Sequence, residues 1–311
     1  MRIVISEFMD EAAVGSLARR FDVRHDATLV DRRDDLLAAL ADADAIIVRN
    51  RTQVDATLLA AAPRLRVVGR LGVGLDNIDV PACAARGIEV IPATGANALA
   101  VAEYVVCTVM MLVRGAYLLS GAVAAGRWPR ASLGEGREVA GKVLGVVGFG
   151  SIGRLAAKLA QGLGMKVLAT DPALDAGAPV WRETGVAYRG LDDLLAEADA
   201  VSLHVPLSRE TRHLISAGRL ARMKRGAVLV NTARGGVVDE RALADALRAG
   251  QLGGAALDVF ETEPLAAGTA LAGVPNLILT PHIAGVTRES NARVSAMIAE
   301  KVAARLERLG S

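Results

Sequence analysis

The sequence predicts an α/β protein with two Rossmann-like domains, each built on a doubly wound parallel sheet. Short apolar runs of strand length alternate with helical patterns along most of the chain, which is the rhythm of βαβ units. A glycine-rich strand–turn–helix pattern begins only near residue 143, so we expect another folded region before it. With 311 residues, 52% of them hydrophobic, the chain can bury two cores.

The first region has four strand-like runs, at 3–5, 45–48, 67–71 and 89–91. Helical patterns separate them at 12–19, 35–40, 56–61 and 81–86. A long apolar helix is expected over 97–119, followed by an excursion rich in Gly and Arg over 121–137.

The second region continues the same alternation. Strands are expected at 143–147, 166–169, 200–204, 227–231, 254–259 and 277–280, and helices after the first glycine turn and at 191–195, 219–221, 240–249 and 288–309. No linker rich in Pro, Gly and Ser separates the regions, so the chain is expected to cross between domains more than once.

The turn after residues 143–147 has the spacing of a dinucleotide-binding site. Gly148 allows a tight turn, Gly150 lets the backbone approach a pyrophosphate, and Gly153 lets the next helix sit close to the sheet. The N–H groups at the start of that helix then face the phosphates. Asp171 ends the following strand, about where a carboxylate accepts the ribose 2′-hydroxyl. Residues 172–179 contain no Arg or Lys for a 2′-phosphate, so the pattern predicts NAD rather than NADP.

Composition argues against several other classes of protein. A net charge of +2 and 3% aromatic residues give no footprint for nucleic acid. The longest apolar stretch, 98–113, contains Glu103 and is too short for a bilayer, and the N-terminus does not look like a signal peptide. Cys83 and Cys107 form neither a disulfide framework nor a metal-binding spacing, so we expect a reduced, cytoplasmic protein without a metal.

Four further motifs carry a resemblance to a known family. They are VGRLGVGLDNIDV at 68–80, VNTARGG at 230–236, ALDVFETEP at 256–264 and TPHIAG at 280–285. Together with the glycine turn they resemble the D-isomer-specific 2-hydroxyacid dehydrogenases, in particular the 3-phosphoglycerate dehydrogenase branch, over essentially the whole chain. The chain looks like the short form, without C-terminal regulatory domains. The resemblance implies a substrate domain of residues 1–94 and 285–311, an NAD-binding domain of residues 95–284, and a homodimer paired through 98–128.

The resemblance also implies a catalytic set of Arg234, Glu263 and His282. This set suits the chemistry, because oxidation of a 2-hydroxy acid needs a base for the hydroxyl proton while a hydride leaves C2. A carboxylate beside the histidine stabilises the imidazolium and fixes its tautomer. An arginine binds the substrate carboxylate as a planar bidentate donor. All three residues follow predicted strands, where open α/β sheets place their sites.

The expected cofactor residues come from the glycine turn and from the resemblance. Asp258 is expected to face the nicotinamide carboxamide, with a buried structural acid as the alternative, and His204 to line the cofactor pocket rather than act as a base. The full set is Gly148, Gly150, Ser151, Ile152, Gly153, Asp171, His204, Val205, Pro206, Thr232, Ala233, Asp258 and Gly285.

The substrate side rests on two groups of residues. Gly72, Val73 and Gly74 form a glycine turn whose N–H groups suit a carboxylate, and Asn97 either lies near the cofactor or caps a helix. Arg51, with Arg49 as second candidate, either binds a second anionic group of the substrate or is an ordinary surface residue.

These residues predict an NAD-dependent oxidoreductase acting on a small 2-hydroxy or 2-oxo acid that carries a second anion. The first expectation is 3-phosphoglycerate, with (S)-3-sulfolactate, hydroxypyruvate and glyoxylate as alternatives. A non-enzyme alternative is an NAD-sensing corepressor, which the intact Arg234, Glu263 and His282 set disfavours.

Overall fold

The computed structural model describes residues 1–310, apart from the side chain of Leu118. The chain divides into two compact units, which we call unit 1 (Met1–Asn97 with the segment from Val286 onwards) and unit 2 (Ala98–Gly285). The sequence placed these boundaries after residues 94 and 284.

Unit 1 is built on a five-stranded parallel sheet in the order β2-β1-β3-β4-β5. Its strands are β1 (Arg2–Ile5), β2 (Asp22–His25), β3 (Ala45–Val48), β4 (Val67–Arg70) and β5 (Glu89–Pro92). Its helices are α1 (Glu11–Ala18), η1 (Leu29–Asp31), α2 (Arg33–Ala39), α3 (Ala56–Ala61), α4 (Val80–Ala85) and α13 (Arg288–Gly310). One core lies between the sheet and α1 with α13, and the other lies under α2, α3 and α4. This is a doubly wound order.

One strand of unit 1 was not predicted, and one glycine accounts for the packing of its C-terminal helix. The edge strand β2 was not predicted, because its sequence DVRH is polar and only partly buried. Gly69 in β4 lies directly under α13, where an added Cβ would come within 2.8 Å of Val302 and 2.9 Å of Ile298. The C-terminal helix therefore packs on the sheet of unit 1 through a position that only glycine fits.

Unit 2 contains a seven-stranded parallel sheet in the order β12-β11-β10-β9-β6-β7-β8. The strands are β6 (Val143–Val147), β7 (Lys166–Thr170), β8 (Ala187–Tyr188), β9 (Ala200–Leu203), β10 (Ala227–Asn231), β11 (Leu252–Leu257) and β12 (Leu277–Leu279). Strand order reverses beside β6, as in dinucleotide-binding sheets, and this gives a switch point between β6 and β9. The predicted fold class is confirmed.

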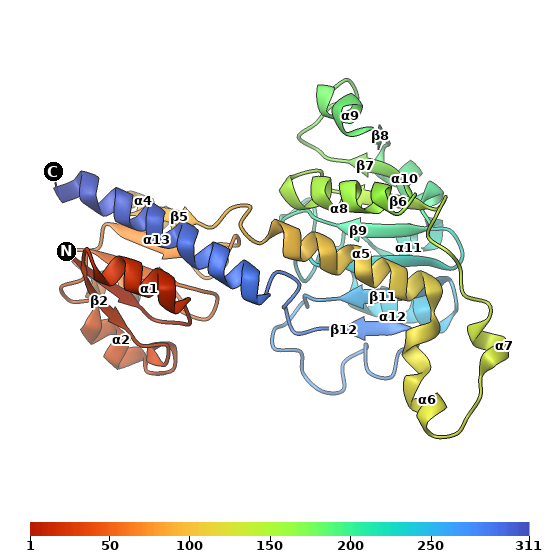
Figure 1. Cartoon of the computed structure of the whole chain (residues 1–311), viewed down its shortest axis with the longest axis horizontal. Coiled ribbons are helices and arrows are strands. Elements are labelled where there is room, and N and C mark those ends of the chain that lie inside the picture. Colours follow the sequence, from red (N-terminus) through yellow and green to blue (C-terminus); the bar gives the residue numbers. More distant parts are fainter. Residues whose placement is uncertain (311) are drawn as a thin grey trace. The chain divides into compact units, whose positions relative to one another are not determined.

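Helices cover both faces of this sheet (Figure 1). One face carries α10 (Leu191–Glu197), α11 (Ala217–Arg222) and α12 (Glu240–Arg248). The other carries α5 (Ala98–Arg114), α8 (Ser151–Gly162) and α9 (Pro179–Thr184), whose Trp181 packs against Phe149. The helix α9 and the short strand β8 were not predicted.

The predicted helix over 97–119 is wrong in its second part. Helix α5 ends at Arg114 because Gly115 has a left-handed backbone (φ 67°). The chain continues as η2 (Ala116–Leu119), α6 (Ser120–Ala124) and α7 (Arg130–Leu133), which lie on an arm extending past the end of α5 (Figure 1). None of the described helices combines the length and the apolar character that a membrane crossing requires.

The parallel register of unit 2 aligns the ends of its strands. Thr170, Val147 and Leu203 are paired neighbours across β7, β6 and β9. The same row continues through Asn231, Leu257 and Leu279 at the ends of β10, β11 and β12. Because these paired residues are the last of their strands, the residues that follow the strands all lie on the same edge of the sheet. These next residues are Asp171, Gly148, His204, Thr232, Asp258 and Thr280.

Candidate active site

The glycine turn at the end of β6 has the tight geometry that its sequence predicts. Gly148 has φ 95°, and an added Cβ there would lie 2.7 Å from the carbonyl oxygen of His204. An added Cβ on Gly153 would lie 2.2 Å from the carbonyl oxygen of Gly148. Around Gly150, by contrast, nothing lies within 4 Å of that position. The turn is therefore closed toward the protein and open at Gly150.

Helix α8 begins directly at this turn. Its N-cap is Gly150, which provides no side-chain cap, so the N–H groups of the first turn, starting at Ser151 and Ile152, are not capped by a side chain. Asp171 reaches back to the turn, since its carboxylate accepts the N–H of Phe149 at 2.7 Å and that of Ala173 at 2.9 Å. The acid at the end of β7 thus also fixes the glycine turn.

The ends of β9 and β10 contribute a neutral histidine and a buried hydroxyl. His204 Nε2 lies 2.9 Å from the Oγ of the buried Ser202, and burial lowers the pKa of His204 to about 4. This histidine is therefore neutral at physiological pH, which fits a pocket wall and not a general base. The Oγ1 of Thr232 is buried and has no hydrogen-bond partner among the described residues. Val205 is buried and Pro206 is exposed.

His282 and Glu263 form a hydrogen-bonded pair. His282 Nδ1 lies 2.8 Å from Glu263 Oε2, and the other carboxylate oxygen of Glu263 accepts the N–H of Phe260 at 3.0 Å. Both side chains are partly exposed, at 45% and 37%. Because Nδ1 faces the carboxylate, Nε2 is the ring nitrogen that is directed away from it and can exchange a proton.

Asp258 binds the loop that carries His282. This carboxylate is 1% exposed and accepts hydrogen bonds from Thr280 Oγ1 at 2.6 Å and from the N–H groups of Ile283 and Ala284, both at 2.8 Å. Three donors stabilise its charge, so Asp258 has the structural role that was the alternative. Its contact with the nicotinamide carboxamide stays a prediction. Gly285, another expected cofactor residue, follows Ala284 directly.

Arg234 lies in a loop that packs against the turn before Glu263. Its Nη1 donates to the carbonyl of Ala233 at 2.6 Å. The buried Asn231 donates from Nδ2 to Arg234 O and accepts the N–H of Ala233 on Oδ1, both at 3.0 Å. At Gly235 an added Cβ would lie 1.7 Å from the carbonyl oxygen of Phe260. The Arg234 loop therefore packs directly against the turn that leads to Glu263, and only glycine permits that approach.

In unit 1, Arg49 follows β3 at the carboxyl edge of the sheet. Its Nη2 donates to Asn291 Oδ1 at 2.8 Å, and its guanidinium lies 5.8 Å from the centre of the Phe8 ring. Burial lowers the pKa of Arg49, and the Glu7 carboxylate partly offsets that effect. A half-buried guanidinium of this kind gains from an additional anion.

Arg51 has a different environment. The sequence favoured Arg51 over Arg49 as the ligand of a second anion, and the surroundings of the two side chains favour the opposite order. It is exposed and forms an ion pair with Asp31, which raises its pKa. The geometry therefore favours Arg49 over Arg51 as the ligand of a second anion, because Arg51 already has a carboxylate partner.

The glycine turn after β4 keeps two of its three expected donors. Gly72 N donates to Arg70 O at 2.8 Å, whereas the N–H groups of Val73 and Gly74 have no partner among the residues that the structure describes. Asn97 ends unit 1, and its Oδ1 is buried without a partner among the same residues. This excludes the alternative in which Asn97 caps α5, since a capping oxygen would accept a backbone N–H.

Sequence reasoning missed several residues that hold the site together. Asn231 and Gly235 lie within a motif that it quoted, so their positions carried a signal. Glu7 is buried and its carboxylate accepts the N–H groups of residues 49–52, but its partners lie more than forty positions away. Tyr104 lies even farther from its partner Thr280, 176 positions along the chain.

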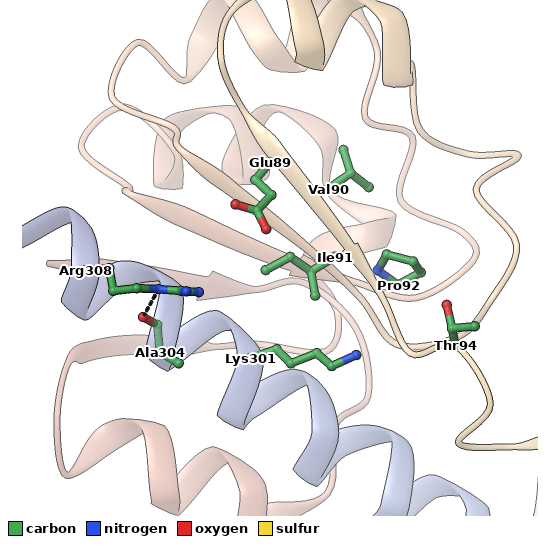
Figure 2. A pocket seen from close by; sticks show the side chains of 8 residues that line it. All are labelled: Glu89, Val90, Ile91, Pro92, Thr94, Lys301, Ala304 and Arg308. Atoms are coloured by element: carbon green, nitrogen blue, oxygen red, sulfur yellow. Dashed lines mark hydrogen bonds between the residues drawn. The ribbon is translucent and has the colours of Figure 1, made fainter.

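A separate pocket of about 410 Å³ lies between β5 and α13 in unit 1 (Figure 2). Lys301 extends along it toward Pro92 and Thr94, and Arg308 bonds the carbonyl of Ala304 at its other end. None of the predicted site residues lines this pocket. The residues that follow the strands of unit 2, from the glycine turn at 148–153 to the loop at 280–285, form what we call the strand-end site, and the pocket shares none of them.

Comparison with known proteins places the chain in a family. Residues 106–284 match the family model of the D-isomer specific 2-hydroxyacid dehydrogenases, NAD binding domain. An (S)-sulfolactate dehydrogenase of Chromohalobacter salexigens is 59% identical over 96% of both chains. This chain is a D-isomer specific 2-hydroxyacid dehydrogenase.

Two other proteins are similar to this dehydrogenase over nearly its whole length. A D-3-phosphoglycerate dehydrogenase of Archaeoglobus fulgidus is 38% identical over 97% of this chain, which spans about half of that relative, 56% of its length. A solved structure, the TT0316 protein of Thermus thermophilus, has a TM-score of 0.88 and 34% identity, covering 99% of this chain and 97% of the other. The predictions of the family, of an enzyme and of NAD as its cofactor are confirmed.

The strand-end site of this D-isomer specific 2-hydroxyacid dehydrogenase fits NAD. The open position at Gly150 and the uncapped start of α8 suit a pyrophosphate, and Asp171 suits the ribose hydroxyl. The orphaned Oγ1 of Thr232 offers a buried polar group that a ligand can satisfy. NAD supplies the acceptor for the hydride that leaves C2 of the hydroxy acid.

Proposed function

We propose that this dehydrogenase interconverts (S)-3-sulfolactate and the corresponding 2-oxo acid, 3-sulfopyruvate. The observation that carries this choice is the 59% identity to the Chromohalobacter salexigens sulfolactate dehydrogenase over nearly the whole of both chains. Relatives named D-3-phosphoglycerate dehydrogenase are 37% to 40% identical, and this chain covers only about half of their length. The sulfonate substrate, which the sequence analysis named as an alternative to 3-phosphoglycerate, is therefore the better supported one.

We assign the reacting groups to His282, Glu263 and Arg234. In the oxidation direction the hydroxyl proton goes to Nε2 of His282 and the C2–O bond becomes a carbonyl, while C2 loses a hydride for which NAD would be the acceptor. Glu263 holds Nδ1 of His282 and so keeps Nε2 available. Arg234 binds the substrate carboxylate. Reduction runs through the same groups, with His282 giving the proton back.

The second anion of the substrate is assigned to Arg49 in unit 1. Its guanidinium is half-buried and is bonded to an amide oxygen and not to a carboxylate, so it keeps its positive charge available. The free N–H groups of Val73 and Gly74, at the same edge of the sheet, support binding of an anion there as well.

A substrate panel with NAD tests this proposal. Sulfolactate, 3-phosphoglycerate, glycerate and D-lactate share the 2-hydroxy acid and differ in the second group. We expect kcat/KM to be about 10- to 100-fold higher for the doubly anionic acids than for D-lactate, since a charge-assisted contact contributes about 1.5–3 kcal/mol. Sulfolactate is expected to rank first. A higher kcat/KM for D-lactate or glycerate than for sulfolactate would overturn the assignment.

The pH dependence separates the two anions within that panel. A phosphate monoester gains its second charge near pH 6, whereas a sulfonate keeps one charge throughout. The ratio of kcat/KM for 3-phosphoglycerate to that for sulfolactate should therefore change between about pH 5 and 7. A constant ratio would show that Arg49 does not sense the charge of this group.

We further propose that two copies pair through α5 and the arm that follows it. Tyr117 and Trp128 on the arm are 61% and 78% exposed, and Met110 on α5 is exposed as well. Large aromatic side chains in water are typical of protein interfaces. Light scattering should give the mass of a dimer at micromolar concentration, and Trp128→Ala should weaken it. A monomer for the unchanged chain would refute this pairing.

We propose the cytoplasm as the site of this activity. Cys83 and Cys107 carry free thiols, as is usual in a reducing compartment. Cell fractionation that finds the activity outside the cytoplasm would overturn this.

A further inference from the structure

A tyrosine of α5 makes contact with the loop that carries His282. The hydroxyl of Tyr104 lies 2.7 Å from Oγ1 of Thr280, although the two residues are 176 positions apart. Tyr104 is half-buried, and burial raises the pKa of its hydroxyl, so it stays protonated. Neither residue belongs to the reacting set assigned above.

The direction of this hydrogen bond follows from the next one. Thr280 has a single hydroxyl proton, which it donates to Oδ1 of Asp258 at 2.6 Å. An ionised carboxylate only accepts, so this proton is not available for Tyr104. Tyr104 is therefore the donor, and the bonds run in one direction, from Tyr104 to Thr280 to Asp258.

These hydrogen bonds reach the backbone segments on both sides of His282. Asp258 also accepts the N–H groups of Ile283 and Ala284, the two residues after His282, and Thr280 lies two residues before it. His282 itself has a left-handed backbone (φ 57°), with its N–H bonded to Thr280 O at 3.0 Å. This unfavourable conformation persists only where surrounding contacts impose it. The buried carboxylate and its donors supply those contacts.

We propose that Tyr104 is a positioning residue for the reaction, acting on His282 through Thr280 and Asp258. The inference rests on the proposed function, in which His282 exchanges the substrate proton. The tyrosine hydroxyl fixes the Thr280 rotamer, Thr280 completes the set of donors around Asp258, and Asp258 sets the backbone that aims the imidazole. Loss of the hydroxyl should loosen that aim and slow proton transfer, while leaving the glycine turn and Asp171 unchanged.

The test compares Tyr104→Phe with Tyr188→Phe, a matched control in the same unit. Tyr188 packs its ring on Trp181, with ring centres 5.6 Å apart, and has no part in the strand-end site. We expect Tyr104→Phe to lower kcat about tenfold, equivalent to about 1.4 kcal/mol in the barrier. KM for NAD should change less than about twofold, and the solvent deuterium isotope effect on kcat should rise. Tyr188→Phe should behave as the unchanged enzyme.

A double-mutant cycle with Thr280→Val tests the route. If Tyr104 acts through Thr280, the loss from Tyr104→Phe should nearly disappear in the Thr280→Val background. Thr280→Ser, which keeps the hydroxyl, should restore most of the rate. Unchanged kcat in Tyr104→Phe, or equal losses in both backgrounds, would overturn the inference. A loss of kcat that only follows a lower Tm, without a change in the isotope effect, would do the same.

A third arm separates this inference from the proposed function. If His282→Asn turns substrate over at the normal rate, His282 is not the base and the proposed function fails. If His282→Asn is inactive and Tyr104→Phe is fully active, the proposed function stands and the positioning role of Tyr104 falls. Inactivity of His282→Asn together with the tenfold, Thr280-dependent loss supports both.

Discussion

The two units hold their functional side chains in different ways. In unit 2 the side chains are bonded to one another or to the backbone. His282 and Glu263 form a pair at 2.8 Å, and Asp258 accepts the Thr280 hydroxyl and two backbone N–H groups. In unit 1 the guanidinium of Arg49 has a neutral partner, Asn291, and an aromatic ring beside it. From this difference we propose that unit 2 holds the reacting groups in fixed positions, whereas unit 1 offers an anion-binding side chain that can adapt.

The backbone of unit 1 is nonetheless rigid where Arg49 begins. Glu7 is 4% exposed, and its carboxylate accepts four consecutive N–H groups, those of residues 49–52, at 2.8–3.3 Å. The loop is therefore fixed by a buried charge, while the side chains that it carries remain available. We therefore expect a change of side chain there to alter the preferred substrate without disturbing the loop.

The largest effect should come from the fixed pair in unit 2. We expect His282→Asn to lower kcat by about 10²–10⁴-fold, the usual contribution of a general base. Because the proton is the same in every substrate, the loss should be similar for sulfolactate and D-lactate, and binding of NAD should change little. Steady-state kinetics and NAD titration by fluorescence would measure both. A loss confined to the doubly anionic acid would break the proposed division between the units.

The next effect concerns stability in unit 2. Burial depresses the pKa of His204 to about 4, so the unfolded chain takes up a proton below about pH 6.5 that the folded chain does not. Stability should therefore be lost as the pH falls from about 6.5 toward 4, by on the order of 3 kcal/mol. Urea unfolding at several pH values should show a flatter profile for His204→Asn. The matched control is the more exposed His213→Asn, and equal flattening there would refute the assignment.

The smallest effect should arise in unit 1 and depend on the substrate. Arg49→Ala should lower kcat/KM for sulfolactate by about 10- to 100-fold and leave D-lactate nearly unchanged. Arg51→Ala removes a residue that is already paired with Asp31, so it should cost less than about threefold. Parallel kinetics with both acids would decide. A larger loss for Arg51→Ala would restore the order that the sequence suggested.

The fold could be predicted where local patterns were strong. The buried strands of unit 2 are continuous apolar runs, and the glycine turn marks β6 and α8 without ambiguity. The polar edge strand β2 has no such pattern, because its pairing with β1 comes from the sheet and not from its own residues. The end of α5 was missed because the apolar pattern continues past Gly115, whose left-handed backbone stops the helix.

The candidate site could be predicted as far as it lies in motifs at strand ends. His282, Glu263 and Arg234 each follow a strand of the same sheet, so their position on one edge follows from the topology. The partners that hold them were missed when they lay on other elements, as Tyr104 does on α5. The ion pair of Arg51 was missed for the same reason, since nothing near Arg51 in the sequence indicates that Asp31 would pair with it.

The left-handed backbone of His282 restricts what can replace it. Asparagine adopts φ values near 57° at little cost, whereas a β-branched residue such as valine is a true outlier there. Inactivity of a valine variant would report a distorted loop as much as a missing imidazole. Asparagine keeps the loop and lacks a usable base. The enzyme carrying it should hold hydroxy acid and NAD together without converting them, which makes it the form best suited to trapping the complete ternary complex in a crystal.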